Sequence, residues 1–141
     1  MRRLLSLAIA VIIFFLSACG STAPPTEFAP PGEIVRKALV LQFRHTSDRL
    51  SRSLKAEPPK IEIDGINVKS LEPVYVEDLA AYHLRGDYDL SLSSPRQKTT
   101  RQHNDFDLYL QRQIEGKSWR LLERTVNPED SEIQWRSYLI D

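Results

Sequence analysis

The amino-acid sequence predicts an α+β fold, in which one N-terminal amphipathic helix packs on a curved antiparallel meander sheet of five or six strands. Residues 33–55 repeat apolar side chains at steps of three and four, the period of a helix with one buried face. Residues 60–140 instead alternate apolar and polar side chains, with turn signals between the alternating runs. A sheet of this kind has one face to bury, and the helix is the element that can cover it.

The start of the chain has the organisation of an export signal. A basic pair at positions 2 and 3 precedes an almost unbroken apolar run over residues 4–15, and this run is shorter than the roughly 20 residues of a membrane-spanning helix. The segment that follows resembles the lipobox of bacterial lipoproteins, and it reads Leu16-Ser17-Ala18-Cys19. The resemblance implies cleavage after residue 18 and a lipid, with palmitate-type acyl chains, on the thiol of Cys19.

Lipid on Cys19 would hold the protein firmly on a membrane, because two or three acyl chains anchor a protein where one chain binds only marginally. We therefore expect a lipid-anchored protein on the exported side of that membrane, periplasmic or extracellular. Two alternatives stay open: a plain secretory signal beside a chance cysteine, and an uncleaved N-terminal anchor. Cys19 is the only cysteine of the chain, so we expect no disulfide and no thiolate metal site.

The residues after the cysteine predict a tether and then one folded domain. Residues 20–32 contain two Pro-Pro pairs among small and polar side chains, which favours an extended polyproline segment of about 3.1 Å per residue, or roughly 40 Å in all. The expected division is a signal peptide over residues 1–18, a lipidated cysteine with its tether over residues 19–32, and a single α+β domain over residues 33–141.

One helix is expected from Glu33 to Lys55. Prolines precede it at positions 30 and 31 and follow it at positions 58 and 59, as is usual at helix boundaries. The stripe that should face the sheet consists of Val35, Leu39, Phe43, Thr46, Leu50 and Leu54. The opposite face of the helix should stay in solvent.

The remaining chain is typical of antiparallel strands joined by short turns. Asp64-Gly65 predicts a hairpin turn, and Gly86 predicts a bend within a long strand. The expected strands cover residues 60–64, 66–76 with a bend at Pro73, 80–93, 104–114, 119–126 and 131–140. Alternation places Tyr82, Leu84, Tyr88, Leu90 and Leu92 on one face, and likewise Phe106, Leu108, Leu110 and Ile114.

This succession resembles the NTF2-like and cystatin-like folds, in which an early helix precedes long, curving, meandering strands. The stretches that carry the resemblance are Phe106-Asp107-Leu108-Tyr109-Leu110, the turn Glu115-Gly116-Lys117, and Trp119-Arg120-Leu121-Leu122. The resemblance covers about residues 33–126. Such folds serve as binding modules, assembly subunits and enzymes, so the resemblance alone does not choose a function.

The charge of the chain is balanced overall and basic in two places. Lysine plus arginine equal aspartate plus glutamate at 19 each, and removal of the leader leaves a net charge of about −2. This balance excludes bulk binding to nucleic acid, which needs a basic field. The helix concentrates positive charge in Arg36, Lys37, Arg44, Arg49 and Arg52, and a predicted loop over residues 94–103 adds Arg96, Lys98, Arg101 and His103. Both segments are candidates for contact with anionic lipid or an acidic partner; the alternative is a solvated helix face and a mobile loop.

Four carboxylates form the second candidate cluster. Asp87 and Asp89 share one face of their strand, as do Asp105 and Asp107. A register with 87 opposite 107 would set 89 opposite 105, and a hard cation such as calcium would relieve the repulsion. The alternative, a solvated face with ion pairs, needs no metal, and we expect no metal and no cofactor.

The sequence contains no nucleophile elbow and no phosphate-binding glycine loop, so we do not expect an enzyme. The one candidate catalytic pair is His83 with Asp87. The first functional hypothesis is a membrane-anchored, non-enzymatic binding or assembly module for an envelope or membrane protein complex. The alternative is a small-ligand carrier or sensor, with a pocket between helix and sheet lined by Phe43, Leu50, Tyr88, Phe106 or Trp119. An NTF2-like enzyme is the third, and it would need an Asp–His pair inside that pocket.

Overall fold

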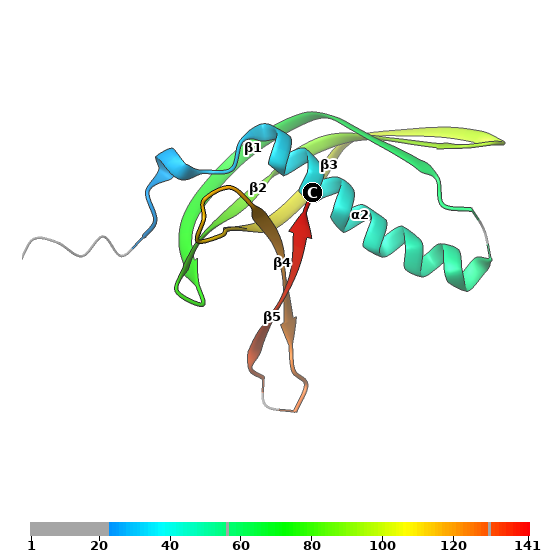
Figure 1. The fold of residues 1–141 in the computed structure, drawn as a ribbon. Coiled ribbons are helices and arrows are strands. Elements are labelled where there is room, and N and C mark those ends of the chain that lie inside the picture. Colours follow the sequence, from blue (N-terminus) through cyan, green and yellow to red (C-terminus); the bar gives the residue numbers. More distant parts are fainter. Residues whose placement is uncertain (1–22, 56, 130) are drawn as a thin grey trace, which may run out of the picture.

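The computed structural model describes residues 23–55, 57–129 and 131–141, and it confirms the α+β fold with a sheet of five strands (Figure 1). All neighbouring strands are antiparallel and follow one another in chain order, as a meander. The elements are the 3-10 turn η1 (Thr26–Phe28), the helix α2 (Gly32–Leu54) and the strands β1 (Lys60–Val76), β2 (Leu79–Ser94), β3 (Gln97–Arg112), β4 (Trp119–Val126) and β5 (Ile133–Ile140).

The sheet is curled, and α2 lies across its concave side (Figure 1). β1, β2 and β3 pair over almost their whole length. β3 and β4 pair only between residues 109–112 and 119–122, so the rest of β4 leaves the sheet together with β5 as a two-stranded ribbon. The molecule therefore has a compact centre from which the β2–β3 hairpin, the ribbon and the end of α2 project.

The core fills the space between α2 and the concave side of the sheet. The helix contributes Val35, Ala38 and Leu39, and the sheet contributes Ile63, Tyr82, Leu84, Leu90, Phe106, Leu108, Leu110, Trp119 and Leu121, all buried. The predicted inward faces of the strands are confirmed for the members of this list. Burial of each large apolar side chain contributes about 1.5–3 kcal/mol, so this layer is the main source of stability.

The helix is almost as predicted, but its last turns are not covered. Lys55 adopts a left-handed conformation with φ 52° and ends α2 after Leu54. Thr46 is exposed, Leu50 is 58% exposed and Leu54 is 75% exposed, so the expectation that the whole stripe faces the sheet is wrong for these three residues. The last turns of α2 project from the centre of the domain (Figure 1).

The predicted hairpin at Asp64-Gly65 is wrong, because β1 continues through it. Asp64 pairs with Asp89 and Asn67 with Asp87, so the strand carries one extra residue here. Gly65 adopts φ +58°, which is a conformation that hairpin turns and β-bulges both require. The sequence signal for a left-handed glycine was therefore correct, and its interpretation as a chain reversal was not. Reversal takes place at Glu77 and Asp78, both with positive φ.

Two further expectations are corrected around β3. Residues 97–103 belong to the strand, and only Pro95 and Arg96 separate β2 from β3, so the basic loop over residues 94–103 is a hairpin end. Ile114 is 87% exposed, because β3 ends at Arg112 and a turn follows, closed by a bond from the Gln113 N–H to the Ser118 carbonyl (3.1 Å).

The end of the expected tether folds against the domain. The Tyr82 hydroxyl donates to the Pro25 carbonyl at 2.7 Å, and the Arg112 guanidinium lies 4.7 Å from the centre of the Phe28 ring. Pro24 and Pro30 are buried. Residues 24–30 are thus part of the folded domain. The expected signal peptide and Cys19 lie outside the described residues, and no helix within those residues is long and apolar enough to cross a membrane.

Candidate functional site

A groove between α2 and the end of β5 is the clearest candidate site. Its volume is about 290 Å³, and it has apolar walls with charged side chains at the rim. We call it the α2–β5 groove; it is lined by Arg36, Lys37, Val40, Leu41, Arg44, Leu139, Ile140 and Asp141. The groove therefore unites three of the five helix cations proposed as contact residues with an apolar strip of the last strand.

The periodicity of the helix places the residues of one wall together. Arg36, Val40 and Arg44 follow one another at steps of four, and Lys37 and Leu41 form a parallel row beside them, so all five side chains lie on neighbouring rows of α2. This wall combines two apolar side chains with three cations. It faces solvent because the opposite side of the helix, with Val35 and Leu39, is buried in the core.

The other wall is held in place by contacts between α2 and the ribbon. The His45 ring packs on the Tyr138 ring with centroids 4.4 Å apart. His45 Nδ1 also lies 3.7 Å from Glu123 Oε1. These contacts fix the last strand against the helix. Leu139 nevertheless remains 47% exposed, so the groove presents apolar surface to solvent.

The three cations of the rim are not neutralised by ion pairs among the described residues. Arg36, Lys37 and Arg44 are exposed, and within residues 23–55, 57–129 and 131–141 none of them forms an ion pair. The carboxylate of Asp141 shares the rim. The groove is thus suited to a ligand that carries apolar groups and more than one negative charge.

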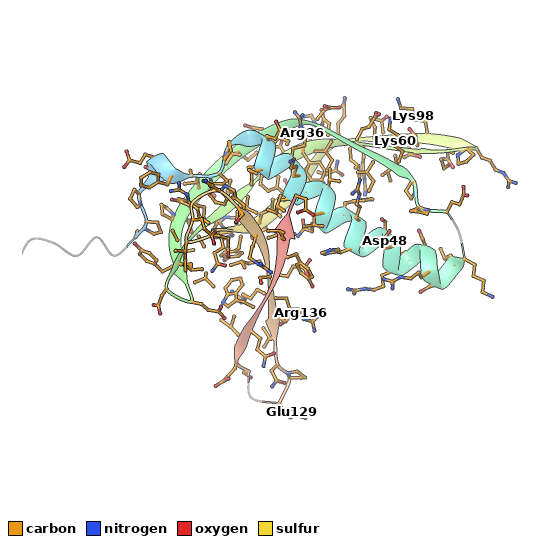
Figure 2. The ribbon with its side chains drawn as sticks, viewed as in Figure 1. Arg36, Asp48, Lys60, Lys98, Glu129 and Arg136 are labelled. Carbon is orange, nitrogen blue, oxygen red and sulfur yellow. The ribbon has the colours of Figure 1, made fainter. Side chains whose placement is uncertain are left out.

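The remaining two predicted helix cations lie elsewhere. Arg52 lines a separate, open hollow with Asp48 and Lys55, and its Nε donates to the Asp48 carbonyl at 3.1 Å. Arg49 is exposed one turn earlier. Figure 2 shows Asp48 on the projecting half of α2, away from Arg36. The sequence treated the five cations as one surface, and the fold divides them between two.

The four predicted carboxylates lie on the convex side of the sheet, but in a different register. Asp87 is opposite Asp105, and Asp107 is opposite Arg85, so the predicted pairing of 87 with 107 is wrong. The tight hairpin end sets the register, and an extra residue in β3 next to His103, which has φ 54°, shifts it once more. Neither feature could be read from the alternation alone.

Three of these carboxylates, Asp87, Asp89 and Asp107, interact with protein groups. Asp87 forms a 2.6 Å ion pair with Lys69, and the hydrogen bond from the ammonium lowers the pKa of the Asp87 carboxyl while raising the pKa of Lys69. Asp89 accepts a bond from the His103 N–H at 3.0 Å. In the described part of the chain, no group of three or more histidine, cysteine, aspartate or glutamate side chains could hold a metal ion.

His83 pairs with Asp107 and not with Asp87. Its Nε2 lies 2.8 Å from Asp107 Oδ1, and its ring stacks on Tyr109 with centroids 4.1 Å apart. The other ring nitrogen lies 3.6 Å from Glu72 Oε2. This network is on the convex side of the sheet, opposite the core. The Asp–His pair that an NTF2-like active site would need inside the sheet is therefore on the outside.

The helix–sheet interface is filled by side chains where the carrier hypothesis needs a pocket. Phe106 and Trp119 are each 6% exposed and belong to the core, with Phe43 and Tyr88 packed against them. Leu50 lies outside, on the projecting half of α2. A hollow between α2 and the sheet with apolar lining residues lies instead in the α2–β5 groove. Its strand wall was missed from sequence, since about a hundred residues separate the two walls and only the fold brings them together.

In comparisons with known proteins, no family model, no curated protein and no solved structure matches the chain. The resemblances to the lipobox and to the NTF2-like and cystatin-like folds stay predictions. The function is therefore argued from the geometry of the groove.

Proposed function

We propose that the chain is a membrane-anchored, non-enzymatic lipoprotein module that binds another protein of the cell envelope in an assembly or accessory role. The α2–β5 groove carries this proposal. It combines apolar walls with three cations at the rim, and protein-binding surfaces have this composition of an apolar centre and a polar border. The apolar part supplies affinity, and the charges set orientation and association rate.

The three cations at the rim of the groove form no ion pairs among the described residues, which supports a partner with carboxylates. Three like charges within nine residues of one helix repel one another, and no acidic side chain of the described residues pairs with them. An acidic partner would remove this repulsion on binding. Leu139 lines the groove and is 47% exposed, which supports the same conclusion, because apolar surface that a partner covers contributes to affinity.

The predicted lipid anchor supports an envelope location. Lipid on Cys19 would confine the protein to a membrane surface, and the groove begins at Arg36, only seventeen positions further along the chain. A partner within the same envelope would then meet the groove at a high effective concentration.

The test is isolation of the native protein from its own host in a mild detergent. An epitope is inserted after Glu115, in an exposed turn, because a tag at Asp141 would obstruct the groove. The extract is sized on a native gel and its components are identified by mass spectrometry. We expect a stoichiometric membrane or envelope complex with the wild-type protein.

Two matched triple variants locate the surface. Arg36→Glu, Lys37→Glu and Arg44→Glu together should abolish the complex. Arg96→Glu, Lys98→Glu and Arg101→Glu reverse three exposed cations of the β2–β3 hairpin, none of which lines the groove, and should leave the complex intact. Circular dichroism checks that both variants fold. A wild-type protein that migrates alone, or equal loss in both variants, would overturn the proposal.

A further inference from the structure

The two outer strands of the sheet differ in their capacity to pair with another strand. β1 contains Pro73, which has no N–H, and two register shifts, between residues 64 and 67 and between 68 and 70. Prolines and bulges are the features by which edge strands avoid pairing. β5 has neither, since its register with β4 is continuous from Ile133 to Ile140. It therefore presents eight regular residues along its outer edge.

In the described part of the chain no strand pairs with the outer edge of β5, and this edge leads into the α2–β5 groove. Leu139 and Ile140 belong both to the strand and to the groove wall. A strand added beside β5 would run past the cations of α2 at this end. Its alternate side chains would point to opposite faces, so one set could enter the groove while carboxylates of the same segment reach the basic rim.

We infer that β5 binds an extended segment of the partner protein as a sixth strand, and that this segment alternates apolar and acidic side chains. Backbone hydrogen bonds along the edge give such complexes their affinity, and side-chain pockets give them specificity. The inference rests on the proposed function, because it specifies how the partner is held. The groove volume of about 290 Å³ accommodates one or two apolar side chains of the segment.

Charge disfavours a second copy of the chain as the occupant. A twofold pairing of β5 with itself about Arg136 would place two guanidinium groups directly opposite each other. Figure 2 shows Arg136 on β5, on the ribbon that leaves the sheet. An anionic bilayer would contact the same helix cations, but it would form no ladder of backbone hydrogen bonds along the strand.

The test measures hydrogen exchange in the mature lipidated protein, in detergent micelles, by mass spectrometry. The probe is the capped peptide (Leu-Glu)4. At about ten times its Kd, the peptide should slow exchange over residues 133–140 roughly ten-fold. The variant with Arg36→Glu, Lys37→Glu and Arg44→Glu should bind it about ten-fold more weakly. The capped peptide (Leu-Lys)4 is the charge control and should give no protection.

Two further peptides test the backbone contribution. One is (Leu-Glu)4 with N-methyl groups on the leucines, and the other has them on the glutamates. At least one of the two presents no N–H to β5 and should lose the protection. Equal protection by both, equal protection by (Leu-Lys)4, or protection confined to β1 or α2 would overturn strand addition. The remaining outcome is that phosphatidylglycerol vesicles slow exchange in α2 while the peptide slows exchange nowhere. This result would mean that the helix cations bind the anionic bilayer, and it would overturn strand addition.

The outcome is separable from that of the proposed function. A stoichiometric native complex in which residues 133–140 exchange as fast as in the free protein would overturn strand addition and leave the binding module standing. Protection of β5 by the peptide, with a native protein that extracts alone, would overturn the envelope partner and retain β5 as a peptide-binding edge.

Discussion

Gly86 occupies a position where the structure has no room for another atom. A Cβ there would collide with the Asn67 carbonyl oxygen and lie 3.0 Å from the Phe106 ring. Gly86→Ala should therefore lower the free energy of unfolding by about 1–3 kcal/mol, the usual cost of overpacking. Urea unfolding followed by circular dichroism measures the change. Gly32→Ala is the control, since no atom lies within 4 Å of its added Cβ, and a similar loss in both variants would contradict the steric explanation.

The Lys69–Asp87 pair should make the stability depend on acid pH. The ammonium holds the pKa of Asp87 below its ordinary value of 3.8, so near this pH the unfolded chain binds the proton more readily than the folded one. The stabilisation is thus complete above the unfolded pKa and is lost as the pH falls through the folded pKa. Unfolding free energies measured between about pH 5 and pH 2 should fall less steeply for Asp87→Asn.

A double-mutant cycle separates this pair from other acids. Lys69→Gln should flatten the same pH dependence, and the combination with Asp87→Asn should add nothing further. If the double variant has a flatter pH dependence of the unfolding free energy than either single variant, Asp87 owes its low pKa to groups other than Lys69.

Cys19 is the residue on which the expected location depends. Cys19→Ser removes the thiol that the lipobox resemblance requires, so the protein should leave the membrane fraction and accumulate uncut or mis-cut. Fractionation with immunoblotting and intact-mass measurement checks both effects. Normal processing together with continued membrane retention would contradict the anchor. Ser17→Thr is a mild control in the same segment and should leave most of the protein on the membrane.

The candidate site was only partly predictable at this scale. Arg36, Lys37 and Arg44 could be chosen from local charge and helical spacing. Leu139 and Ile140 could not, because nothing local marks the residues of a last strand that will meet a helix a hundred positions earlier. The predicted pairing of the carboxylates was wrong for a different reason. Strand alternation fixes the face of Asp87 and Asp107, but their register depends on the hairpin end and on the bulge at His103.

At the scale of elements, two leucines of the same apolar stripe of α2 differ in burial. Leu39 is 2% exposed and Leu54 is 75% exposed, although the sequence period gives both the same role. Leu39→Ala should cost about 2–5 kcal/mol of unfolding free energy, because it leaves a cavity in the core. Leu54→Ala should change it by less than about 0.5 kcal/mol. Equal losses in urea titrations would show that the end of α2 is covered in solution.

The elements themselves were predictable to the extent that their signals are local. The helix and the central strands follow from periodicity and from prolines at the helix boundaries. Gly65 shows the limit of such signals, because a positive φ serves a bulge as well as a hairpin turn. The reversal at Glu77 and Asp78 shows the converse, since a tight turn without glycine can place even a glutamate at positive φ when long flanking strands pair on both sides.

For the whole molecule, the folded N-terminal segment changes the expected distance from the membrane. The bond from Tyr82 to the Pro25 carbonyl and the contact of Arg112 with Phe28 attach residues 24–30 to the domain. Only five peptide links separate Cys19 from Pro24, and they span at most about 18 Å when fully extended. A lipid on Cys19 would therefore keep the end of the domain that carries η1 close to the bilayer, where the sequence alone predicted a tether of roughly 40 Å.

This geometry predicts an orientation that fluorescence can measure. In lipidated protein the single native thiol is blocked, so Glu27→Cys and Arg96→Cys each introduce one labelling site, both at exposed residues. Figure 1 shows η1 and the end of the β2–β3 hairpin at opposite sides of the domain. In liposomes with a headgroup quencher, a fluorophore at position 27 should be quenched strongly and one at position 96 weakly. Equal quenching would show that the domain tumbles freely, and the contacts of Tyr82 and Arg112 would then not hold residues 24–30 in the anchored protein.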